Sequence, residues 1–326
     1  MLQLGIIGTG SISHEFIKAA QLSGEYQLTA VYSRTLSSAE RFAQDYKNVA
    51  LYTDMIEFLS ADLDAVYIAS PNSLHFNHAK VAILARKHVI VEKPAVSRPE
   101  EWQELVKLAA EHQVYIFEAA RNYHEAALAV IQDFLKDKKI WGANFTYAKY
   151  SSKMGALLSG QEPNVFSAKF SGGALMDLGV YTLYAAVRLF GAPKSVCYTA
   201  QQLPNSVDLN GSGSLIYPDF QVRIQAGKNI HSQLPAEIYT DQGTLTLDGI
   251  EFIRSAIFQK LTGETESLAI HQAEHQMLEE AQAFARVLKG GQEELYSDYL
   301  QAATAVHECL FAMRKDGGIR FEVDHD

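Results

Sequence analysis

The sequence predicts an α/β protein in which a doubly wound parallel sheet is followed by a second domain with an antiparallel sheet. In the first part of the chain, short apolar stretches typical of buried strands alternate with helical patterns, as in a parallel sheet. From Ser195 to Phe258 the chain is rich in strands, and Phe220 to Ala226 alternates apolar and polar residues. Such alternation is typical of an antiparallel sheet with one covered face. We place the domain boundary after residue 120, giving domains 1–120 and 121–326.

The composition is that of a globular protein and argues against several classes of function. Of the 326 residues, 48% are hydrophobic and 20% are charged, and the formal net charge is −10. This acidic balance argues against a nucleic-acid partner and against an anionic membrane surface. Cys197 and Cys309 do not resemble a disulfide framework, and a reducing compartment fits them best. We see no basic leader and no apolar run near the roughly 20 residues of a membrane span, so we expect a cytoplasmic protein.

The first strand, Leu2 to Ile7, runs into a glycine turn and then into a helical pattern that extends to Leu22. This order is typical of a dinucleotide-binding turn, in which Gly8 permits the tight turn and Gly10 lets the backbone approach a pyrophosphate. Ser13 stands at the third small position in place of glycine or alanine. The turn residues predicted to bind the cofactor are Gly8, Thr9, Gly10, Ser11 and Ile12.

The second strand, Tyr26 to Tyr32, ends in Ser33, Arg34 and Thr35. An NAD-preferring site carries an acid here for the ribose 2′-hydroxyl, whereas hydroxyls and a guanidinium suit a 2′-phosphate. The alternative is that Arg34 only stacks on adenine or faces water. The sequence therefore favours NADP as cofactor, with NAD possible.

The rest of the first domain continues the alternation of helices and strands. Helical patterns cover Leu36–Tyr46, Asp54–Leu59 and Pro99–Glu111, and strand patterns cover Ala50–Tyr52, Ala65–Ala69, His88–Val91 and Val114–Phe117. After Ala69, the polar groups of Ser70, Asn72 and His75 stand at a carboxyl strand end, where ligands bind in open α/β sheets. His75 and His78 lack nearby cysteines or carboxylates, so a structural role is favoured over metal binding, and we predict no metal.

The strand that starts at His88 ends in Glu92, Lys93 and Pro94. Proline cannot donate the next hydrogen bond of the ladder, so the strand stops there. Glu92 and Lys93 therefore stand at a carboxyl strand end, where a bound cofactor and substrate would lie. A solvated Glu–Lys pair that merely closes the strand is the alternative.

In the second half, a helix from Glu125 to Lys136 and a strand from Ile140 to Tyr150 precede a glycine-bearing stretch. The next helical pattern, which ends at Phe190, carries a polar stripe of Asp177, Tyr181, Tyr184 and Arg188. The four-residue spacing places the Asp177 carboxylate and the Tyr181 hydroxyl on one helix face. Taken alone, such a stripe is more often a plain polar face than an active site.

The C-terminal part contains two predicted turns and two predicted helices. Asp241-Gln242-Gly243 and Asp248-Gly249 are typical of hairpin turns. One helix carries Met277, Ala281, Phe284 and Leu288, and the other carries Ala303, Val306, Leu310 and Met313. His271 and His275 have metal-compatible spacing, but without a third convergent ligand a solvated face is favoured.

Four motifs in order make the chain resemble the Gfo/Idh/MocA oxidoreductase family over essentially its whole length. They are Gly8-Thr9-Gly10, Pro71 to His75, Glu92-Lys93-Pro94 and Gly172 to Tyr181. The resemblance implies an N-terminal Rossmann domain and a C-terminal α/β domain with an open, mainly antiparallel sheet. It also implies a cis Lys93–Pro94 bond and a homodimer or homotetramer. The implied reaction is hydride transfer between a nicotinamide and a hydroxyl-bearing carbon of a small-molecule sugar, polyol or cyclic diol.

The resemblance assigns three catalytic residues, because the family's lysine corresponds to Lys93, its aspartate to Asp177 and its histidine or tyrosine to Tyr181. The tyrosine resembles the glucose-fructose oxidoreductase and dihydrodiol dehydrogenase branch, whereas many inositol dehydrogenases carry histidine. We expect Lys93, Asp177 and Tyr181 to converge on one cleft and to bind substrate together with Asn122 and Phe166.

The residue types fit the implied chemistry, because a hydroxyl that loses hydride must also lose a proton. A free tyrosine, with a pKa near 10, is a weak base at neutral pH, and a charged Lys93 at roughly 5 Å would lower that pKa by about two units. Asp177 would orient the substrate and keep Lys93 charged. Two alternatives remain, a non-catalytic NADP-binding sensor or scaffold and a closed-cycle enzyme that never releases NADP.

Overall fold

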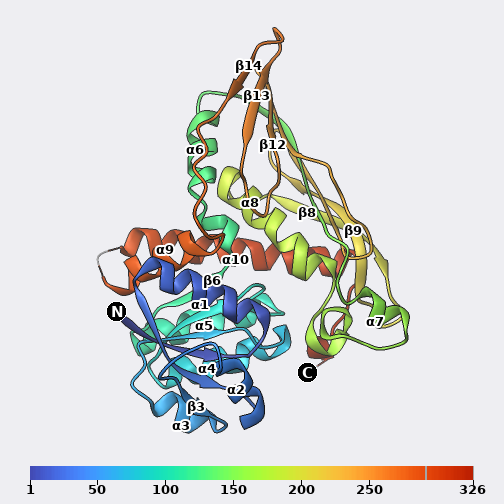
Figure 1. The fold of residues 1–326 in the computed structure, drawn as a ribbon. Helices are drawn as coiled ribbons and strands as arrows, with labels where there is room; N and C mark the ends of the chain where they lie inside the picture. Colours follow the sequence, from blue (N-terminus) through green and yellow to red (C-terminus); the bar gives the residue numbers. More distant parts are fainter. Residues whose placement is uncertain (291, 326) are drawn as a thin grey trace. The chain divides into compact units, whose positions relative to one another are not determined.

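The computed structural model describes residues 1–290 and 292–325, and it divides into two compact units (Figure 1). Unit 1 comprises Met1–Ala119 together with Glu274–Gln301, and unit 2 comprises Ala120–Ala273 together with the chain from Ala302 onward. The first break lies within one residue of the boundary expected from the sequence. The segment Glu274–Gln301, expected in the second domain, instead belongs to unit 1.

Unit 1 is built on a six-stranded sheet in which every neighbouring pair is parallel. Its strand order is β3-β2-β1-β4-β5-β6, which confirms the doubly wound topology. The strands are β1 (Leu2–Ile7), β2 (Tyr26–Tyr32), β3 (Ala50–Tyr52), β4 (Ala65–Ile68), β5 (His88–Glu92) and β6 (Ile116–Ala119). The order reverses between β1 and β4, and the crevice at such a switch point is where ligands bind in these sheets.

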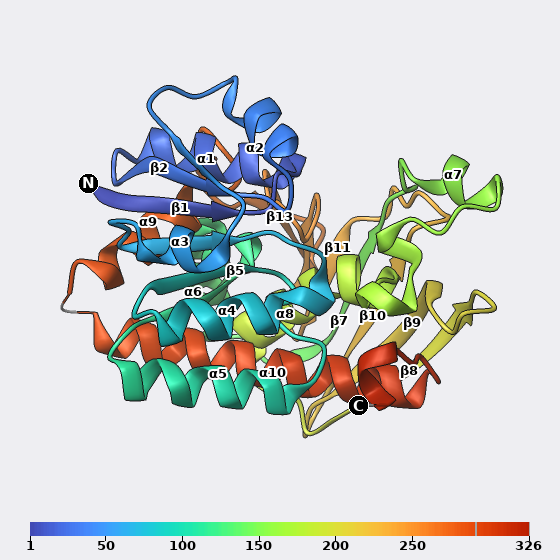
Figure 2. The ribbon, with the colours of Figure 1, turned by 90° about the horizontal axis from the view of Figure 1, so that it is seen from below.

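The helices of unit 1 pack on both faces of this sheet. They are α1 (Ser11–Ser23), α2 (Leu36–Ala43), α3 (Met55–Ser60), α4 (His75–Leu84), α5 (Pro99–His112) and α9 (Leu278–Leu288). On one face Phe16 of α1 stacks on Tyr67 with ring centroids 3.9 Å apart, and Phe284 of α9 stacks on Phe117 at 4.7 Å. Helices α4 and α5 lie side by side (Figure 2). The core contacts of Phe284 explain why α9, far along the chain, belongs to unit 1.

Unit 2 is built on an eight-stranded sheet of order β14-β13-β12-β11-β7-β10-β9-β8. Every pairing is antiparallel except that of β7 with β10, so the sheet is mixed and mainly antiparallel, as expected. The strands are β7 (Ile140–Ala148), β8 (Ser195–Gln202), β9 (Asp208–Ile216), β10 (Gln221–Gly227), β11 (Ala236–Thr240), β12 (Gly243–Leu247), β13 (Ala256–Lys260) and β14 (Thr265–Ser267). On β10, Val222, Ile224 and Ala226 are buried while Arg223 is exposed, which confirms the predicted alternation.

The helices of unit 2 include one apolar stretch that was not expected from the sequence. They are α6 (Ala126–Leu135), α7 (Met154–Leu158), the π-helical turn η5 (Leu175–Gly179) and α8 (Val180–Phe190), with short 3₁₀ turns η2 (Arg121–His124), η3 (Asn164–Phe166), η4 (Ala168–Phe170) and η6 (Glu322–His325). Helix α10 (Glu293–Asp316) begins in unit 1 and ends in unit 2, and the 3₁₀ turn η1 (Asn72–Leu74) belongs to unit 1. The helical stretch Ala168–Phe190 is long and apolar enough to cross a membrane, contrary to expectation, but 83% of its apolar window is buried inside the structure. It therefore has the burial of a core helix.

Several local predictions differ from the structure. Strand β6 begins at Ile116 rather than Val114, because the Val114 amide still donates to Ala109 of α5. Asp248 does not form a hairpin turn, since its carboxylate accepts from the amides of Arg254 and Ser255 and closes a longer loop.

His275 does not lie on a solvated face. Its ring is buried, with Nε2 2.9 Å from a Glu15 carboxylate oxygen of α1. Its Nδ1 accepts from the amide of Met277 at 3.2 Å. His275 therefore joins the start of α9 to α1 within unit 1.

Candidate active site

The glycine turn after β1 fits a dinucleotide. Gly8 has φ +106°, and a Cβ there would overlap the carbonyl oxygen of Ala69, so only glycine is accommodated. At Gly10 a Cβ would meet nothing within 4 Å, and α1 begins directly after it without a side-chain cap. Uncapped amides at a helix N-terminus beside open space suit a pyrophosphate. Thr9, Ser11 and Ile12 belong to the same turn.

Ser13, the departure from the expected glycine or alanine, faces inward. It is fully buried, and its hydroxyl donates to the Gly8 carbonyl oxygen at 2.8 Å. Its amide donates to the carbonyl oxygen of Gly10 at 3.1 Å. A buried hydroxyl with a partner costs little, so Ser13 closes the turn from inside.

In the turn after β2, the Thr35 side chain has a different role from those of Ser33 and Arg34. Thr35 caps α2, because its hydroxyl oxygen accepts from the Ser38 amide at 3.4 Å and its hydroxyl donates to that of Ser38 at 2.9 Å. Arg34 is exposed, and the first acid after β2 is Glu40, which lies on an exposed part of α2. Ser33 and Arg34 are therefore better suited than Thr35 to a 2′-phosphate.

Two histidines hold the turn after β4. His75 is buried, with Nδ1 3.0 Å from the Pro94 carbonyl oxygen and Nε2 2.7 Å from that of Ser70. His78 places Nδ1 2.9 Å from the Ser70 hydroxyl. Burial lowers the pKa of both rings, that of His78 to about 4 with help from the charges of His75 and Arg34. His75 thus joins two strand-end turns, while Ser70 and Asn72 remain half-buried.

The Lys93 turn is held through its backbone by Glu92. The Lys93–Pro94 bond is cis, which confirms the expectation from the family resemblance. The buried Glu92 carboxylate accepts from the Lys93 amide at 3.2 Å and from the Tyr67 hydroxyl of β4. A buried carboxylate that is fully hydrogen-bonded keeps one orientation. Lys93 itself is half-buried.

Two further buried groups complete the support of this turn. Glu118 of β6 accepts from the Ala95 amide at 3.0 Å, and His75 contacts the Pro94 carbonyl oxygen. The turn is therefore fixed from β5, from β6 and from the start of α4. All of these contacts reach backbone atoms, so they set the course of the chain at Lys93 independently of the lysine side chain.

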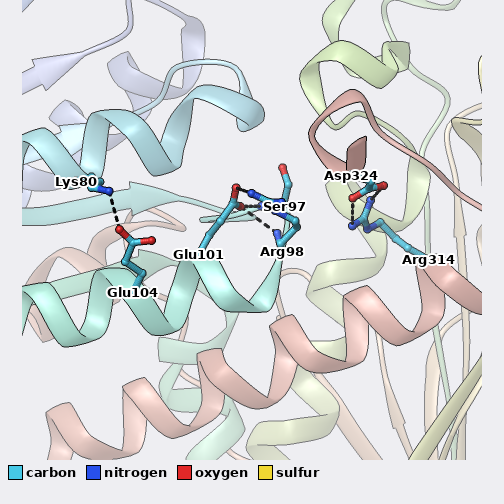
Figure 3. A network of polar contacts seen from close by, with 7 residues as sticks. All are labelled: Lys80, Ser97, Arg98, Glu101, Glu104, Arg314 and Asp324. Carbon is cyan, nitrogen blue, oxygen red and sulfur yellow. Dashed lines mark hydrogen bonds and ion pairs between the residues drawn. The ribbon is translucent and has the colours of Figure 1, made fainter. Parts of the chain in front are cut away.

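The segment after the turn is tied to α5 (Figure 3). The Glu101 carboxylate accepts from the amides of Ser97 and Arg98, both at 3.0 Å, and pairs with the Arg98 guanidinium at 3.4 Å. Lys80 of α4 donates to Glu104 of α5 at 2.6 Å. The contacts of Glu101 anchor the chain that leaves the Lys93 turn.

Asp177 and Tyr181 lie on two successive helical segments of unit 2. Asp177 belongs to the π-helical turn η5 and Tyr181 to the first turn of α8. A π turn inserts a residue into a helix, so their relative direction is set by that turn rather than by the α-helical spacing assumed from the sequence. The buried Tyr181 ring meets the ring of Tyr147 at 5.4 Å, and the Arg121 guanidinium lies 5.0 Å from its centroid. The stripe is therefore not a plain polar face.

Lys228, at the end of β10, contacts Asp177 although no motif marks it in the sequence. Its ammonium pairs with Asp177 Oδ2 and lies 5.7 Å from the centroid of the Phe166 ring. A signal does exist, because continuing the buried series Val222, Ile224 and Ala226 by two residues places Lys228 on the covered face. A lysine at an inward position is rarely buried unless it is paired.

Asn122 and Phe166, the two further residues predicted to bind substrate, are both buried. The Asn122 amide donates to the carbonyl oxygens of Tyr181 at 2.9 Å and Ile250 at 3.1 Å. Phe166 presents its ring to the Lys228 ammonium. Within unit 2, Asn122 therefore holds the backbone at Tyr181 and Ile250, and Phe166 packs against the Lys228 ammonium.

Asp208 anchors the start of the helical segment that carries Asp177. Its buried carboxylate accepts from the Leu175 amide at 2.8 Å and from the Tyr198 hydroxyl at 3.0 Å. Burial raises the pKa of this carboxyl to about 6, although its hydrogen bonds oppose the shift. Gly173 has φ +120°, and a Cβ there would overlap Asp208 Oδ1. The glycine before the helix is therefore required by both conformation and space.

The chain belongs to the Gfo/Idh/MocA oxidoreductase family. Residues 2–120 match the family model described as an oxidoreductase family with an NAD-binding Rossmann fold. Residues 139–246 match the model of the GFO/IDH/MocA C-terminal domain. The protein is therefore an oxidoreductase whose unit 1 is a nicotinamide-dinucleotide-binding Rossmann fold.

Two curated relatives align over nearly the whole chain. It is 36% identical to the uncharacterized oxidoreductase YgjR of Escherichia coli and 33% identical to the scyllo-inositol 2-dehydrogenase (NADP(+)) IolU of Bacillus subtilis, with 99% of each chain covered in both cases. A trans-1,2-dihydrobenzene-1,2-diol dehydrogenase of Danio rerio is 29% identical, over 59% of this chain and 57% of its own.

Among solved structures, KijD10, a 3-ketoreductase from Actinomadura kijaniata in complex with NADP and TDP-benzene, superimposes with a TM-score of 0.85 at 20% identity, covering 97% of each chain. This likeness shows a shared fold.

Proposed function

We propose that the protein is an NADP-dependent oxidoreductase that transfers a hydride between the nicotinamide and a hydroxyl-bearing carbon of a cyclic polyol, a sugar or a cyclic diol. The observation that carries this proposal is the pairing, at one edge of one parallel sheet, of the dinucleotide cradle after β1 with the anchored Lys93 turn after β5. The family membership and the end-to-end likeness to an NADP-dependent inositol dehydrogenase support it.

The residues of unit 1 would hold the cofactor. Gly8 to Ile12 offer backbone amides to the pyrophosphate, and Ser33 and Arg34 take the 2′-phosphate. Ser70, Asn72 and Glu92 stand at neighbouring strand ends, where the nicotinamide half would lie. When bound, the cofactor supplies or accepts the hydride.

The remaining roles concern the proton and the substrate. Tyr181 takes the proton of the reacting hydroxyl, and the positive charge of Lys93 stabilises the negative charge that develops there. Asp177 binds a second substrate hydroxyl. This proposal assigns Lys93, Asp177 and Tyr181 to the same substrate molecule, and their convergence on one cleft stays a prediction.

A panel of substrates tests the proposed function. The purified protein is mixed with NADP⁺ or NAD⁺ and with scyllo-inositol, myo-inositol, trans-cyclohexane-1,2-diol or an aldose, and nicotinamide absorbance is followed. We expect reduction of NADP⁺ with at least one cyclic polyol or diol, and slower reduction of NAD⁺. Absence of turnover with every compound, in both directions, would contradict the proposal.

We further propose a cytoplasmic homodimer or homotetramer that pairs through the outer face of the eight-stranded sheet. This face presents Arg223, Glu237, Tyr239 and the exposed Ile257. A depression of about 360 Å³ lies on it, lined in part by Asn144. Light scattering that gives the monomer mass of 36.1 kDa at micromolar concentration would count against an oligomer.

A further inference from the structure

The ion pair between Lys228 and Asp177 is asymmetric in its exposure to solvent. The Lys228 side chain is 5% exposed, whereas that of Asp177 is 33% exposed. The ammonium therefore stands behind the carboxylate, and only the carboxylate reaches the surface of unit 2. An ammonium removed from water depends on its partner, because an unpaired buried charge is strongly unfavourable.

The backbone holds Lys228 in one place. Its amide donates to the carbonyl oxygen of Leu209 at 2.7 Å, and its carbonyl oxygen accepts from the Ser151 amide at 2.8 Å. The Phe166 ring covers the ammonium from another element, η3. With its backbone bonded on both sides and its ammonium under an aromatic face, Lys228 directs its charge at Asp177 Oδ2.

The pairing with Lys228 sets the direction of the Asp177 carboxylate. A carboxylate that accepts a hydrogen bond from an ammonium is favoured in its ionised form. The partner in this ion pair is a residue of the same unit. The partly exposed carboxylate is thereby presented as an oriented hydrogen-bond acceptor.

We propose that Lys228 is a positioning residue for the reaction. It holds the Asp177 carboxylate in one orientation, so that Asp177 accepts a hydrogen bond from the hydroxyl next to the reacting carbon of a polyol or diol. Lys228 does not itself touch the substrate and acts only through Asp177. This inference rests on the proposed function.

The first test is Lys228→Met, which keeps an unbranched side chain of similar length and removes its charge. With NADP⁺ and the best polyol of the panel, kcat/KM should fall about 10²-fold, mainly through a higher KM for the polyol, because a misplaced binding group has effects of this size. NADPH affinity, measured by fluorescence titration, should stay within about twofold of the native protein. Lys149→Met is the matched control, because Lys149 is exposed and follows β7, the strand paired with β10, and this variant should keep native kinetics.

A double-variant cycle separates positioning from a merely structural role. In Asp177→Asn the acceptor charge is gone, so adding Lys228→Met should change kcat/KM by less than about twofold. The double variant buries no lone charge, so it should fold even where Asp177→Asn alone, which leaves the Lys228 ammonium buried and unpaired, does not. A further tenfold loss in the double variant would overturn the proposal, as would native kinetics or equal losses of polyol and NADPH binding in Lys228→Met.

The same measurements distinguish this inference from the proposed function. If the native protein turns over no polyol, sugar or diol, the proposed function fails and the role of Lys228 fails with it. If the native protein is active but the cycle shows no dependence of Lys228 on Asp177, only the role of Lys228 is overturned.

Discussion

The two units hold their candidate catalytic groups in different ways. In unit 1 the Lys93 turn is anchored by Glu92, Glu118 and His75, all of which bind backbone atoms. In unit 2 the Asp177 carboxylate is anchored by a side chain, that of Lys228, which lies 51 residues further along the chain. A turn held by its backbone keeps its course when its side chain is changed. A carboxylate oriented by the ammonium of a distant residue is sensitive to the loss of that residue.

The comparison predicts that substitutions in the two units change different properties of the protein. Substitutions at the Lys93 turn should test chemistry without loss of structure, and substitutions in unit 1 that touch the cofactor cradle should alter cofactor affinity. Substitutions around η5 and α8 should alter turnover and leave NADPH binding intact.

The largest effect is expected for Tyr181→Phe, which removes the proposed proton acceptor of unit 2. Turnover should fall by about 10²–10⁴-fold, the usual contribution of a positioned acid or base. NADPH affinity should change little, because the dinucleotide cradle belongs to unit 1. Steady-state kinetics with the best polyol and a fluorescence titration with NADPH measure the two quantities. Normal turnover would mean that the proton leaves by another route.

Lys93→Met should also lower turnover, by about 10²-fold, and should shift the pH at which the remaining activity falls. Because the turn is anchored through backbone atoms, we expect the melting temperature to remain within a few degrees of the native value. A pH–rate profile and a thermal melt are the measurements. A variant that unfolds would show that the side chain, and not the backbone contacts, maintains the turn.

Arg34→Ala should weaken NADPH binding by about 10- to 150-fold, equivalent to the roughly 1.5–3 kcal/mol of a hydrogen bond to a charged group. NADH binding should change little, since NADH lacks the 2′-phosphate. Gly10→Ala is the matched control, because its Cβ would enter the open space before α1, where the pyrophosphate shared by both cofactors is proposed to lie, and should weaken both alike. Equal losses of NADH and NADPH in Arg34→Ala would mean that the guanidinium only stacks on adenine.

Lowering the pH should decrease the stability contribution of His78 in unit 1 and increase that of Asp208 in unit 2. The pKa of His78 in unit 1 is lowered to about 4, so the unfolded chain binds the proton more readily and stability is lost as pH falls from 6.5 toward 4. The pKa of Asp208 in unit 2 is raised to about 6, so the folded chain binds the proton more readily and stability is gained as pH falls from 6 toward 4. Each contribution is at most about 3 kcal/mol, and that of the partly solvated His78 is smaller.

Hydrogen exchange corrected for intrinsic rates, measured at pH 7 and pH 5, checks this contrast. Protection should decrease in α4 and increase around η5. Asp208→Asn should abolish the gain around η5 and leave α4 unchanged. A parallel loss of protection in both units would contradict the opposite signs.

The smallest effect is expected for Thr35→Ala. Removal of the α2 cap should lower the free energy of unfolding by about 1 kcal/mol, as measured by urea denaturation. NADPH affinity should remain at its native value, because the Thr35 hydroxyl is engaged by Ser38. A tenfold loss of NADPH affinity would instead return Thr35 to the phosphate site.

The sequence predicted what is encoded over short distances. The alternation of strands and helices, the glycine turn and the Glu92-Lys93-Pro94 turn are each specified by adjacent residues, and the structure contains them all. The contacts that hold those motifs in place could not be predicted from adjacent residues. Glu118 acts on Ala95 from another strand, and its own neighbours in the sequence show no pattern that marks this role.

The same limit applies more strongly in unit 2. Asp208 reaches Leu175 across 33 residues, and Lys228 reaches Asp177 only because η5 packs on β10. The π turn that carries Asp177 is likewise invisible, because its five residues match an ordinary apolar helix pattern. For this site the sequence offered one signal, the position of Lys228 in the inward-facing series that continues from β10.

The split composition of unit 1 has a consequence for the order in which the protein is made. Helix α9 buries Ala281, Phe284 and Val287 in the core of the Rossmann sheet, and the Tyr26 hydroxyl donates to the Ala281 carbonyl oxygen at 3.0 Å. During synthesis β1 to β6 leave the ribosome long before this helix. On the sheet face against which α1 packs, the part that α9 covers therefore stays exposed while the whole eight-stranded sheet is translated. The nucleotide-binding fold, although first in the sequence, reaches its finished core only after the strands of unit 2 have been made.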